Sequence, residues 1–448
     1  MPNHSCLKRH IAIAIPLALA AGCGGDASDT GDAGAAELRY WQDVAPIYFE
    51  RCVTCHRDGG IAPFRLDTYE DAAAWGPASV AATAARTMPP WGVVSDGSCG
   101  DFRDAPTLTQ DEIDRIAAWV DGGLAPGEPR TDLVVPADPD LTGALALATP
   151  DFVPEAQGGP YAAFDEYRCF LLDPALAADA YITGYQVLPG DPALVHHVLV
   201  MPVDPSHDVG GGVTNLDVIE ALDAESPDRE GWPCFGLAGD DVDVDSMPVV
   251  WAPGQGAVEF PAGVGAPVRR DDLLVVQVHY NLAGHAEAGA SDSTTIRLRL
   301  ADQVDLEAIY VSLDPFLDTL YDDPPASLAP GQASASYTWE VPVGAWLADL
   351  GLPSARLWGL FPHMHERGRT MRVELDSDGD GDYQCAADVP AWDFHWQMHY
   401  FLAEATPIDP GASLRVTCTY DTRDAAEAVL PGWGTQNEMC FLGALLTP

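Results

Sequence analysis

Basic residues are scarce in this sequence. Its 448 residues hold 22 lysines and arginines against 68 aspartates and glutamates, and Lys8 is the only lysine. The formal net charge of −46 repels phosphate backbones and anionic lipid headgroups, so we expect no nucleic-acid partner. The acidic residues are spread along the chain instead of gathering in a tail. We interpret them as a solubility feature, with attraction of a basic partner as the alternative.

Long apolar runs are also missing, because the run Ile11–Ala21 is too short to span a membrane. It follows a basic start of the chain, which is typical of a signal peptide. We predict a signal peptide over residues 1–22, lipidation of Cys23 in a bacterial lipoprotein-like Ala-Ala-Gly-Cys box, and a tether over 23–37. Ordinary secretion with loss of Cys23 is the alternative. Either way, we expect the mature protein outside the cytoplasm, with a lipid anchor as its only membrane contact.

The motif Cys52-Val53-Thr54-Cys55-His56 has the spacing of a c-type haem attachment site. It predicts thioether bonds from Cys52 and Cys55 to haem c, with His56 as the proximal iron ligand. Met88, in a later proline-containing loop, is the predicted sixth ligand, and His/Met ligation is typical of electron transfer. A zinc knuckle would need a second Cys/His pair, and a redox Cys-x-x-Cys would not need the histidine. The alternative for Met88 is an ordinary core or surface methionine.

Helical patterns surround this motif. Val44–Phe49 predicts a helix that leads into it, and Thr109 caps a final helix that ends at the two glycines 122–123. We therefore expect a small all-α domain over residues 38–128, similar to a class I cytochrome c. The proline- and aspartate-rich residues 129–140 are the predicted linker.

Helical periodicity is scarce from residue 141 onward. Short runs of Val, Leu, Ile, Tyr and Thr alternate there with Gly, Pro and Asp clusters, which is typical of antiparallel β-sandwiches. The length suits two jelly-roll-like sandwich domains, predicted at 141–303 and 304–448. The clearest strand-like runs are 181–188, 273–280, 294–300 and 414–420.

Five histidines lie in strand-like segments. His363 and His365 stand two apart, so on a strand their side chains share one face and can chelate copper or zinc. His196 and His197 are adjacent, so both can reach one metal only at a strand end or an irregularity. His279 is central in an apolar run. The alternatives are solvated surface histidines for the first pair and a hydrogen-bonded core residue for His279.

Taken in order, these motifs resemble the copper type II, ascorbate-dependent monooxygenases, the family of peptidylglycine and dopamine hydroxylating enzymes. The resemblance covers residues 141–448 and implies two packed sandwiches, each with one copper ion. It assigns one copper to the His-His pair and the later Gln-Val-His-Tyr strand, which here are His196, His197 and His279. It assigns the other to His-x-His and the methionine of Glu-Met-Cys, which here are His363, His365 and Met439.

The resemblance also implies two disulfide bonds, Cys418–Cys440 and Cys169–Cys234. Cys99 and Cys385 then remain without a family partner. A bond between these two would attach the haem domain to the second sandwich, and we leave their pairing open.

The sequence departs from the peptide-amidating members of the family at the substrate site. Those enzymes hold a substrate carboxylate with an Arg two residues before His-x-His and with an Asn and a Tyr after the Met. The matching positions here are Phe361, Phe441 and Gly443. We therefore expect an apolar or aromatic small-molecule substrate near Phe361 and Phe441.

The hypothesis for function is hydroxylation of a C–H bond with O₂. The resemblance makes His363, His365 and Met439 the catalytic copper ligands, while the other copper stores an electron. The haem is the expected relay for electrons from an external donor, either ascorbate or a redox protein. The alternative is a non-catalytic electron-transfer or copper-binding protein outside the cytoplasm.

Three other features are given structural roles. Residues 376–382 resemble a calcium loop, but Ala387 stands where the closing Glu is needed, so we expect an acidic hairpin turn. His395 and His399 lie among aromatic residues and are expected to pack on or beside a sheet. His207 and His285 are expected in loops.

Overall fold

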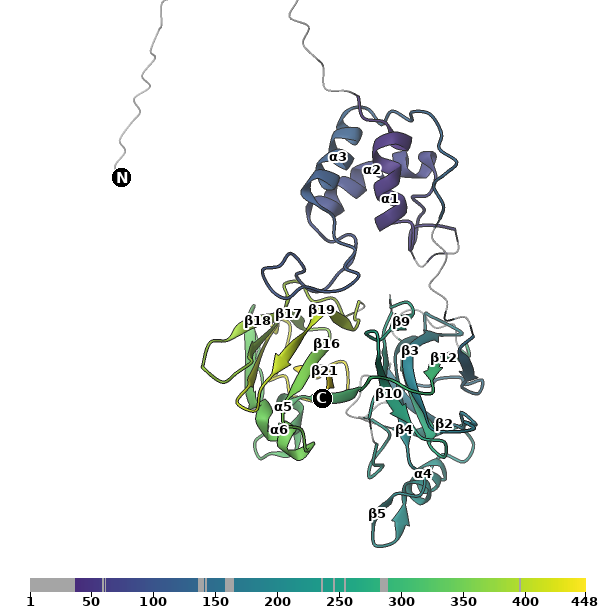
Figure 1. The fold of residues 1–448 in the computed structure, drawn as a ribbon, viewed down its shortest axis with the longest axis vertical. Coiled ribbons are helices and arrows are strands. Elements are labelled where there is room, and N and C mark those ends of the chain that lie inside the picture. Colours follow the sequence, from purple (N-terminus) through teal and green to yellow (C-terminus); the bar gives the residue numbers. More distant parts are fainter. Residues whose placement is uncertain are drawn as a thin grey trace, which may run out of the picture. The chain divides into compact units, whose positions relative to one another are not determined.

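Strands dominate the described part of the chain (Figure 1). The computed structural model describes residues 37–448 except 59, 61, 136–140, 142, 158–164, 235–236, 245, 254, 283–288 and 395. The predicted signal peptide, Cys23 and the tether up to residue 36 therefore lie outside the described residues. Among the residues described, no helix has both the length and the apolar character needed to cross a bilayer.

Three α-helices form the helical region, residues 37–128. A π-helical turn, Tyr40–Val44, runs into α1 (Ala45–Arg51), and α2 (Tyr69–Ala84) and α3 (Gln110–Asp121) follow. Thr109 forms the predicted capping box at the start of α3. The helices share a core of their own, centred on the fully buried side chains Tyr40, Val44, Tyr48, Ile116 and Trp119.

Two sheets form the first β region, residues 141–307. They share one core, in which Ile182 and Tyr185 of one sheet pack with Val198 and Val276 of the other. The first sheet has the spatial order β1 (Leu145–Ala148), β12 (Thr295–Ala301), β3 (Ala180–Leu188), β10 (Val264–Val268) and β13 (Leu306–Glu307), with β9 (Val258–Glu259) also beside β3. The second has the order β7 (Trp232–Pro233), β2 (Asp165–Leu172), β11 (Leu273–Asn281), β4 (Val195–Val203) and β8 (Val249–Trp251). A small hairpin, β5 (Asp208–Gly210) and β6 (Val213–Thr214), leads into α4 (Asn215–Asp223).

Two four-stranded antiparallel sheets form the second β region, residues 309–448, and they also share a core. The first has the order β14 (Ile309–Leu313), β21 (Phe441–Thr447), β16 (Ala355–His363) and β19 (Tyr400–Ile408). The second has the order β15 (Ala335–Pro342), β20 (Ser413–Tyr420), β17 (Gly368–Asp376) and β18 (Gln384–Val389). The short helices are α5 (Pro315–Asp318), the 3₁₀ turn Thr319–Tyr321 and α6 (Val343–Asp349). The acidic segment 376–382 is the turn between β17 and β18, as expected.

Three disulfide bonds cross-link the described part of the chain. Two are the pairs that the family resemblance implies, Cys169–Cys234 and Cys418–Cys440. The third joins Cys99, which follows the helical region's Met88 loop, to Cys385 on β18 of the second β region.

Residues 91–103, which we name the docking segment, lie on the edges of both sheets of the second β region. The Val94 N–H donates to the carbonyl of Asp388 on β18, at 2.8 Å. Two more 2.8 Å backbone bonds, from Arg103 to Phe401 and from Ala403 to Asp101, attach the segment to β19. Unlike the helices, this part of the N-terminal third therefore belongs structurally to the second β region.

Asp314 is a buried carboxyl that caps α5. It accepts hydrogen bonds from the backbone N–H groups of Phe316 and Leu317, and from that of Cys440 in the next layer. Burial raises the pKa of Asp314 from 3.8 to about 7. Because the folded state favours the protonated form, the stability from this group is full below about pH 4 and is lost as the pH rises through about 7.

The Asp314→Asn variant should therefore gain stability relative to the wild type as the pH rises. Asparagine keeps an oxygen acceptor but carries no charge to bury. We expect the difference in unfolding free energy, variant minus wild type, to increase by on the order of a few kcal/mol between pH 5 and pH 8. Urea unfolding at both pH values measures this difference. A difference that stays constant or shrinks would contradict the assignment.

Candidate metal centres

Three histidines of the first β region converge through a β-bulge. Strands β4 and β11 pair His197 with His279 and Val195 with Tyr280, so His196 is an extra residue between these pairs. The bulge is the irregularity that two adjacent ligands require, because it turns both imidazoles to one side. The Nδ1 atom of His197 lies 3.3 Å from that of His196 and 3.2 Å from that of His279.

Asp165 holds the imidazole of His279 in one orientation. Its Oδ1 lies 3.2 Å from His279 Nε2, and its Oδ2 accepts a 2.7 Å hydrogen bond from the Thr435 hydroxyl of the second β region. An ionised carboxylate only accepts, so Nε2 carries the proton and Nδ1 presents its lone pair toward His197. Tyr167 stacks on the same ring, with centroids 4.0 Å apart. Burial lowers the pKa of His279 despite the nearby carboxylate, and the neutral imidazole is the form that binds a metal.

Replacing Asp165 with asparagine should weaken metal binding at His196, His197 and His279. One oxygen acceptor becomes an N–H₂ donor that faces either His279 Nε2–H or the Thr435 hydroxyl. We expect copper affinity at this centre to fall by about 10–100-fold, the usual effect of losing a carboxylate partner of a histidine ligand. Competition with a copper chelator measures the affinity, and Asp151→Asn, at an exposed position outside the site, is the control. Unchanged affinity in Asp165→Asn would contradict this role.

The second centre lies at the end of β16. His363 is the last residue of that strand, and His365 follows two positions later. His363 Nδ1 lies 2.6 Å from Gln397 Oε1, and His365 Nδ1 lies 3.1 Å from the carbonyl of Asn437. Since both partners are acceptors, each Nδ1 carries the proton, and each Nε2 is left for a metal. Met364 is fully buried in the core, as expected for the residue on the opposite face.

Burial keeps both imidazoles of this centre neutral. It lowers the pKa of His363 to about 4 and that of His365 to about 3. Met439 lines the same cavity as the two histidines and adds a soft thioether. These donors fit copper: two neutral imidazoles and a thioether form the kind of ligand set that also suits the reduced metal.

A buried carboxyl, Glu438, joins the two segments that carry these ligands. Its side chain is 0% exposed and accepts the backbone N–H groups of His365, at 2.9 Å, and Arg367, at 2.7 Å. Burial raises the pKa of Glu438 to about 8. The residue precedes Met439, so it connects the histidine loop directly to the methionine.

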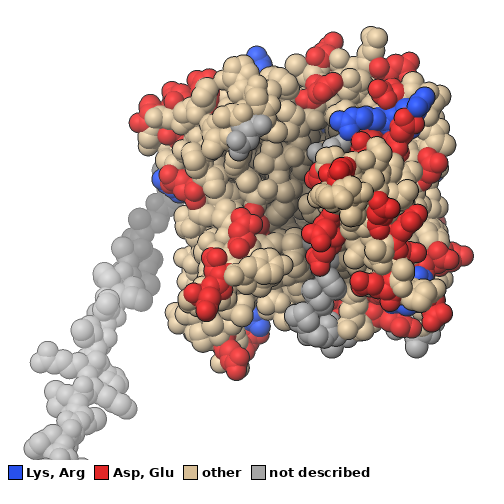
Figure 2. All heavy atoms as spheres, turned by 90° about the horizontal axis from the view of Figure 1, so that it is seen from below, with Lys and Arg blue, Asp and Glu red and all other residues tan. Residues whose placement is uncertain are grey.

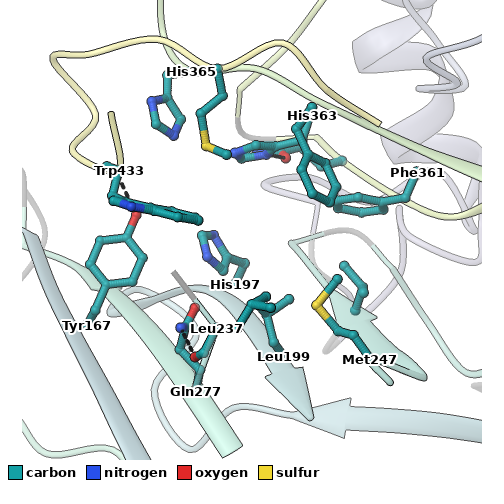
Figure 3. A pocket seen from close by; sticks show the side chains of 14 residues that line it. Tyr167, His197, Leu199, Leu237, Met247, Gln277, Phe361, His363, His365 and Trp433 are labelled. Carbon is teal, nitrogen blue, oxygen red and sulfur yellow. Dashed lines mark hydrogen bonds between the residues drawn. The ribbon is translucent and has the colours of Figure 1, made fainter. Parts of the chain in front are cut away.

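The two centres face one shared cavity (Figure 3). The rings of His197 and His363 are 6.0 Å apart, and the Tyr167 hydroxyl of the first β region donates to the Trp433 carbonyl of the second at 2.9 Å. The cavity of about 70 Å³ is roughly half the size of an apolar cavity known to bind benzene, so a larger molecule enters only if lining side chains move. The lining residues are Tyr167, His197, Leu199, Leu237, Met247, Val250, Gln277, Phe361, His363, His365, Gln397, Trp433, Met439 and Phe441.

The lining is aromatic and aliphatic. Phe361 and Phe441, the two positions at which the sequence departs from the peptide-amidating enzymes, both contact this cavity. The Phe361 ring lies nearly parallel to that of His363, with centroids 6.4 Å apart. Within the described part of the chain, no Asp, Glu, Lys or Arg side chain lines the cavity, although acidic side chains are scattered over the surface (Figure 2).

The predicted haem residues lie in the turns that directly follow α1. Cys52 and Cys55 take part in none of the described disulfide bonds, and His56 is buried with Nδ1 at 3.0 Å from the carbonyl of Phe64. That carbonyl accepts the Nδ1 proton and leaves Nε2 for an iron ion, so these three residues fit c-type haem attachment. Met88 is 41% exposed and lines a surface hollow with Trp91, and its role as the sixth ligand stays a prediction.

Two further described histidines, His399 and His207, are not members of either centre. His399 is buried and packs against Phe361 and Phe401, in line with a packing role. His207 is exposed in a loop, as expected. His285 and His395 lie outside the described residues.

Each β region brings a group of histidines to one apolar cavity, which is lined by His197 of the first region and by His363 and His365 of the second. This arrangement suits a metalloprotein with paired centres. Residues 348–442, which contain His363, His365 and Met439, match the family model described as copper type II ascorbate-dependent monooxygenase, C-terminal domain. This match and the similarities below support a relationship with that family.

Three animal proteins show the extent of the similarity. DBH-like monooxygenase protein 1 of Homo sapiens is 26% identical over 328 residues, which are 69% of this chain and 49% of that protein. Tyramine beta-hydroxylase of Caenorhabditis briggsae is 25% identical over 193 residues, 42% of this chain and 32% of that protein. Dopamine beta-hydroxylase of Canis lupus familiaris is 26% identical over 201 residues, 42% of this chain and 30% of that protein. The chain thus spans half or less of the length of these relatives.

Proposed function

We propose that the protein is a copper-dependent monooxygenase that hydroxylates a C–H bond of a neutral, apolar or aromatic molecule with O₂. One observation carries the proposal: two different ligand sets, three clustered histidines and two histidines with a methionine, meet at one apolar cavity. His197 of the first set and all three residues of the second line this cavity. Copper storage alone would not require two unlike sets beside a shared apolar cavity. This is the argument against the alternative, a non-catalytic copper-binding or electron-transfer protein.

The residues of the chain have distinct parts in this reaction. Copper, when bound, supplies the one-electron chemistry that the reduction of O₂ requires. His363, His365 and Met439 hold the copper beside the substrate, and the thioether favours its reduced form. Phe361 and Phe441 contact the substrate and keep water out of the cavity. His196, His197 and His279 hold the second copper, which stores an electron.

The substrate is inferred from the lining. The relatives are named for tyramine and dopamine, which carry an ammonium group at neutral pH. A buried ammonium needs a carboxylate or a set of acceptors, but the described lining offers no carboxylate. A neutral aromatic or aliphatic molecule fits the Phe361 and Phe441 surface better.

The rest of the chain suits an enzyme outside the cytoplasm. We infer that each β region is a β-sandwich, and that residues 38–128 carry haem c on Cys52, Cys55 and His56. The haem then relays electrons from ascorbate or a redox protein. A lipid on Cys23 would hold the enzyme at the periplasmic or outer cell surface.

Metal analysis and oxygen uptake test the proposal. The protein, produced with haem maturation and loaded with copper, should contain two copper ions and one haem per chain. With ascorbate, O₂ uptake should rise when neutral aromatic compounds are added and should stay low with acidic peptides. A single copper per chain, or uptake that no compound in a broad neutral panel stimulates, would contradict a monooxygenase.

A further inference from the structure

The docking segment brings an aromatic residue of the Met88 loop into contact with the second β region. Trp91 follows Met88 by three residues, so their Cα atoms are at most about 11 Å apart. Both side chains line the same surface hollow. On its other side, the Trp91 ring packs edge-to-face on Tyr400 of β19, with centroids 5.1 Å apart.

This contact depends on a close backbone approach at the next residue. The Gly92 N–H donates to the Tyr400 hydroxyl at 3.1 Å. A Cβ atom at position 92 would lie 2.2 Å from that hydroxyl oxygen, so a larger residue would push the Tyr400 ring away. The three backbone bonds of the docking segment and the Cys99–Cys385 disulfide hold the surrounding chain in place.

Aromatic rings continue from Tyr400 to the His363 centre. His399 precedes Tyr400 in the chain, and its ring lies 5.6 Å from that of Phe361 on the neighbouring strand β16. Phe361 is in turn 6.4 Å from His363 and nearly parallel to it. Every through-space step from Trp91 to the metal centre thus joins rings whose centroids are no more than 6.4 Å apart.

We propose that Trp91, Tyr400, His399 and Phe361 form an electron-transfer route from the haem of the helical region to the copper held by His363, His365 and Met439. This inference rests on the proposed haem and copper sites. In each transfer one electron leaves ferrous haem, which becomes ferric, and reduces Cu(II) to Cu(I). No bond of the chain is formed or broken. The rings and the peptide link between His399 and Tyr400 provide the path.

The route specifies which copper receives the electron first. It reaches the centres through Phe361, which contacts His363. The three-histidine centre lies one step further, across the 6.0 Å separation of the His363 and His197 rings. The His363 centre is therefore the entry point, and the other copper is filled from it.

Anaerobic kinetics on the full-length protein test the route. The oxidised protein, loaded with haem and Cu(II), is mixed with a substoichiometric reductant that reduces the haem, and the haem absorbance and the Cu(II) EPR signal are followed. In the wild type, ferrous haem should reoxidise in a fast phase as the Cu(II) signal falls. Trp91→Leu and Tyr400→Leu should lose this fast phase while their copper and haem contents stay normal. Trp346→Leu, which removes another half-buried tryptophan packed on the same core, should keep it.

Further variants separate the route from stability effects. Gly92→Ala keeps both rings but displaces them, and should also lose the fast phase. Loss of the His363 copper in His363→Ala should abolish fast haem reoxidation, whereas His279→Ala should retain it. The proposal is overturned if Trp91→Leu and Gly92→Ala react like the wild type, or if His279→Ala loses the fast phase while His363→Ala keeps it.

A separate readout keeps this test distinct from the monooxygenase proposal. Ascorbate in large excess can also reduce the copper ions directly, without the haem, so Trp91→Leu should retain substrate-dependent O₂ uptake under this condition. If the wild type shows no substrate-dependent O₂ uptake, the proposed monooxygenase function is wrong. The reoxidation of ferrous haem by Cu(II) would then still test the electron-transfer route.

Discussion

The His363→Ala variant should bind one copper per chain where the wild type binds two, and it should lose substrate-dependent O₂ uptake altogether. The residue supplies one of only two imidazoles at its centre, with Nε2 aimed into the cavity by the hydrogen bond from Nδ1 to Gln397. Alanine leaves His365 and the Met439 thioether, a pair too weak to retain the metal against a chelator. Copper analysis after dialysis and an oxygen electrode measure the two effects.

Two variants make this result specific. His279→Ala should also reduce the copper content to one per chain. In this variant the copper of the three-histidine centre is lost, and the His363 centre keeps its ligands. His207→Ala removes an exposed loop histidine and should leave both copper content and O₂ uptake at wild-type levels. If His363→Ala retains two coppers or full uptake, the assignment of the catalytic centre is wrong.

Glu438→Ala should both destabilise the protein and empty the same centre. The substitution leaves the buried N–H groups of His365 and Arg367 without their acceptor, at a cost of about 1–3 kcal/mol each. It also removes the link between the histidine loop and the Met439 segment. We expect a lower unfolding midpoint and weak copper binding at this centre, with normal binding at the three-histidine centre.

The measurement is urea unfolding of the copper-free protein combined with a copper titration. Glu427→Ala removes an exposed carboxylate from the same part of the chain and serves as the control. A Glu438→Ala protein with wild-type stability and two tightly bound coppers would show that this buried carboxyl does not organise the site.

Local patterns predicted where the candidate histidines lie, because strand-like runs can be recognised from near neighbours in the chain. Their division into two ligand sets, and the inclusion of Met439, came from the family resemblance and stays a prediction. His-x-His on a strand requires only the alternation of side chains. In the structure β16 ends at His363, and His363 and His365 nevertheless line one cavity. The adjacent pair needed an irregularity, and the bulge at His196 supplies it. The apolar run around His279 became β11, within one residue of its predicted end.

The supporting residues could not be predicted in the same way. Asp165 and Thr435 meet across a sequence separation of 270, and no local pattern reports such a contact. A glutamate beside Met439 is normally a surface residue, so the burial of Glu438 depends on the fold around it. The helix α2 was not predicted, and it contains Gly76 and Pro77, residues that usually interrupt a helix.

The attachment of the docking segment to the second β region could not be predicted from the sequence either. The analysis of cysteines left Cys99 and Cys385 as an open pair, and the bond is present. Edge pairing of the segment with β18 and β19 follows from tertiary packing, because residues 91–103 have no strand-like alternation of their own.

The Cys99–Cys385 bond closes a covalent ring that contains the whole first β region. The two cysteines are 286 residues apart, and that region carries neither of them. When this region unfolds, the disulfide still closes its chain into a loop, which has fewer conformations than an open chain. In the chain-entropy model this loss of entropy in the unfolded state stabilises the folded state by on the order of 5 kcal/mol. Cys99→Ser removes this bond alone and leaves the Cys169–Cys234 bond of the first β region in place. The substitution should therefore lower the thermal stability of a part of the protein that the removed bond does not touch.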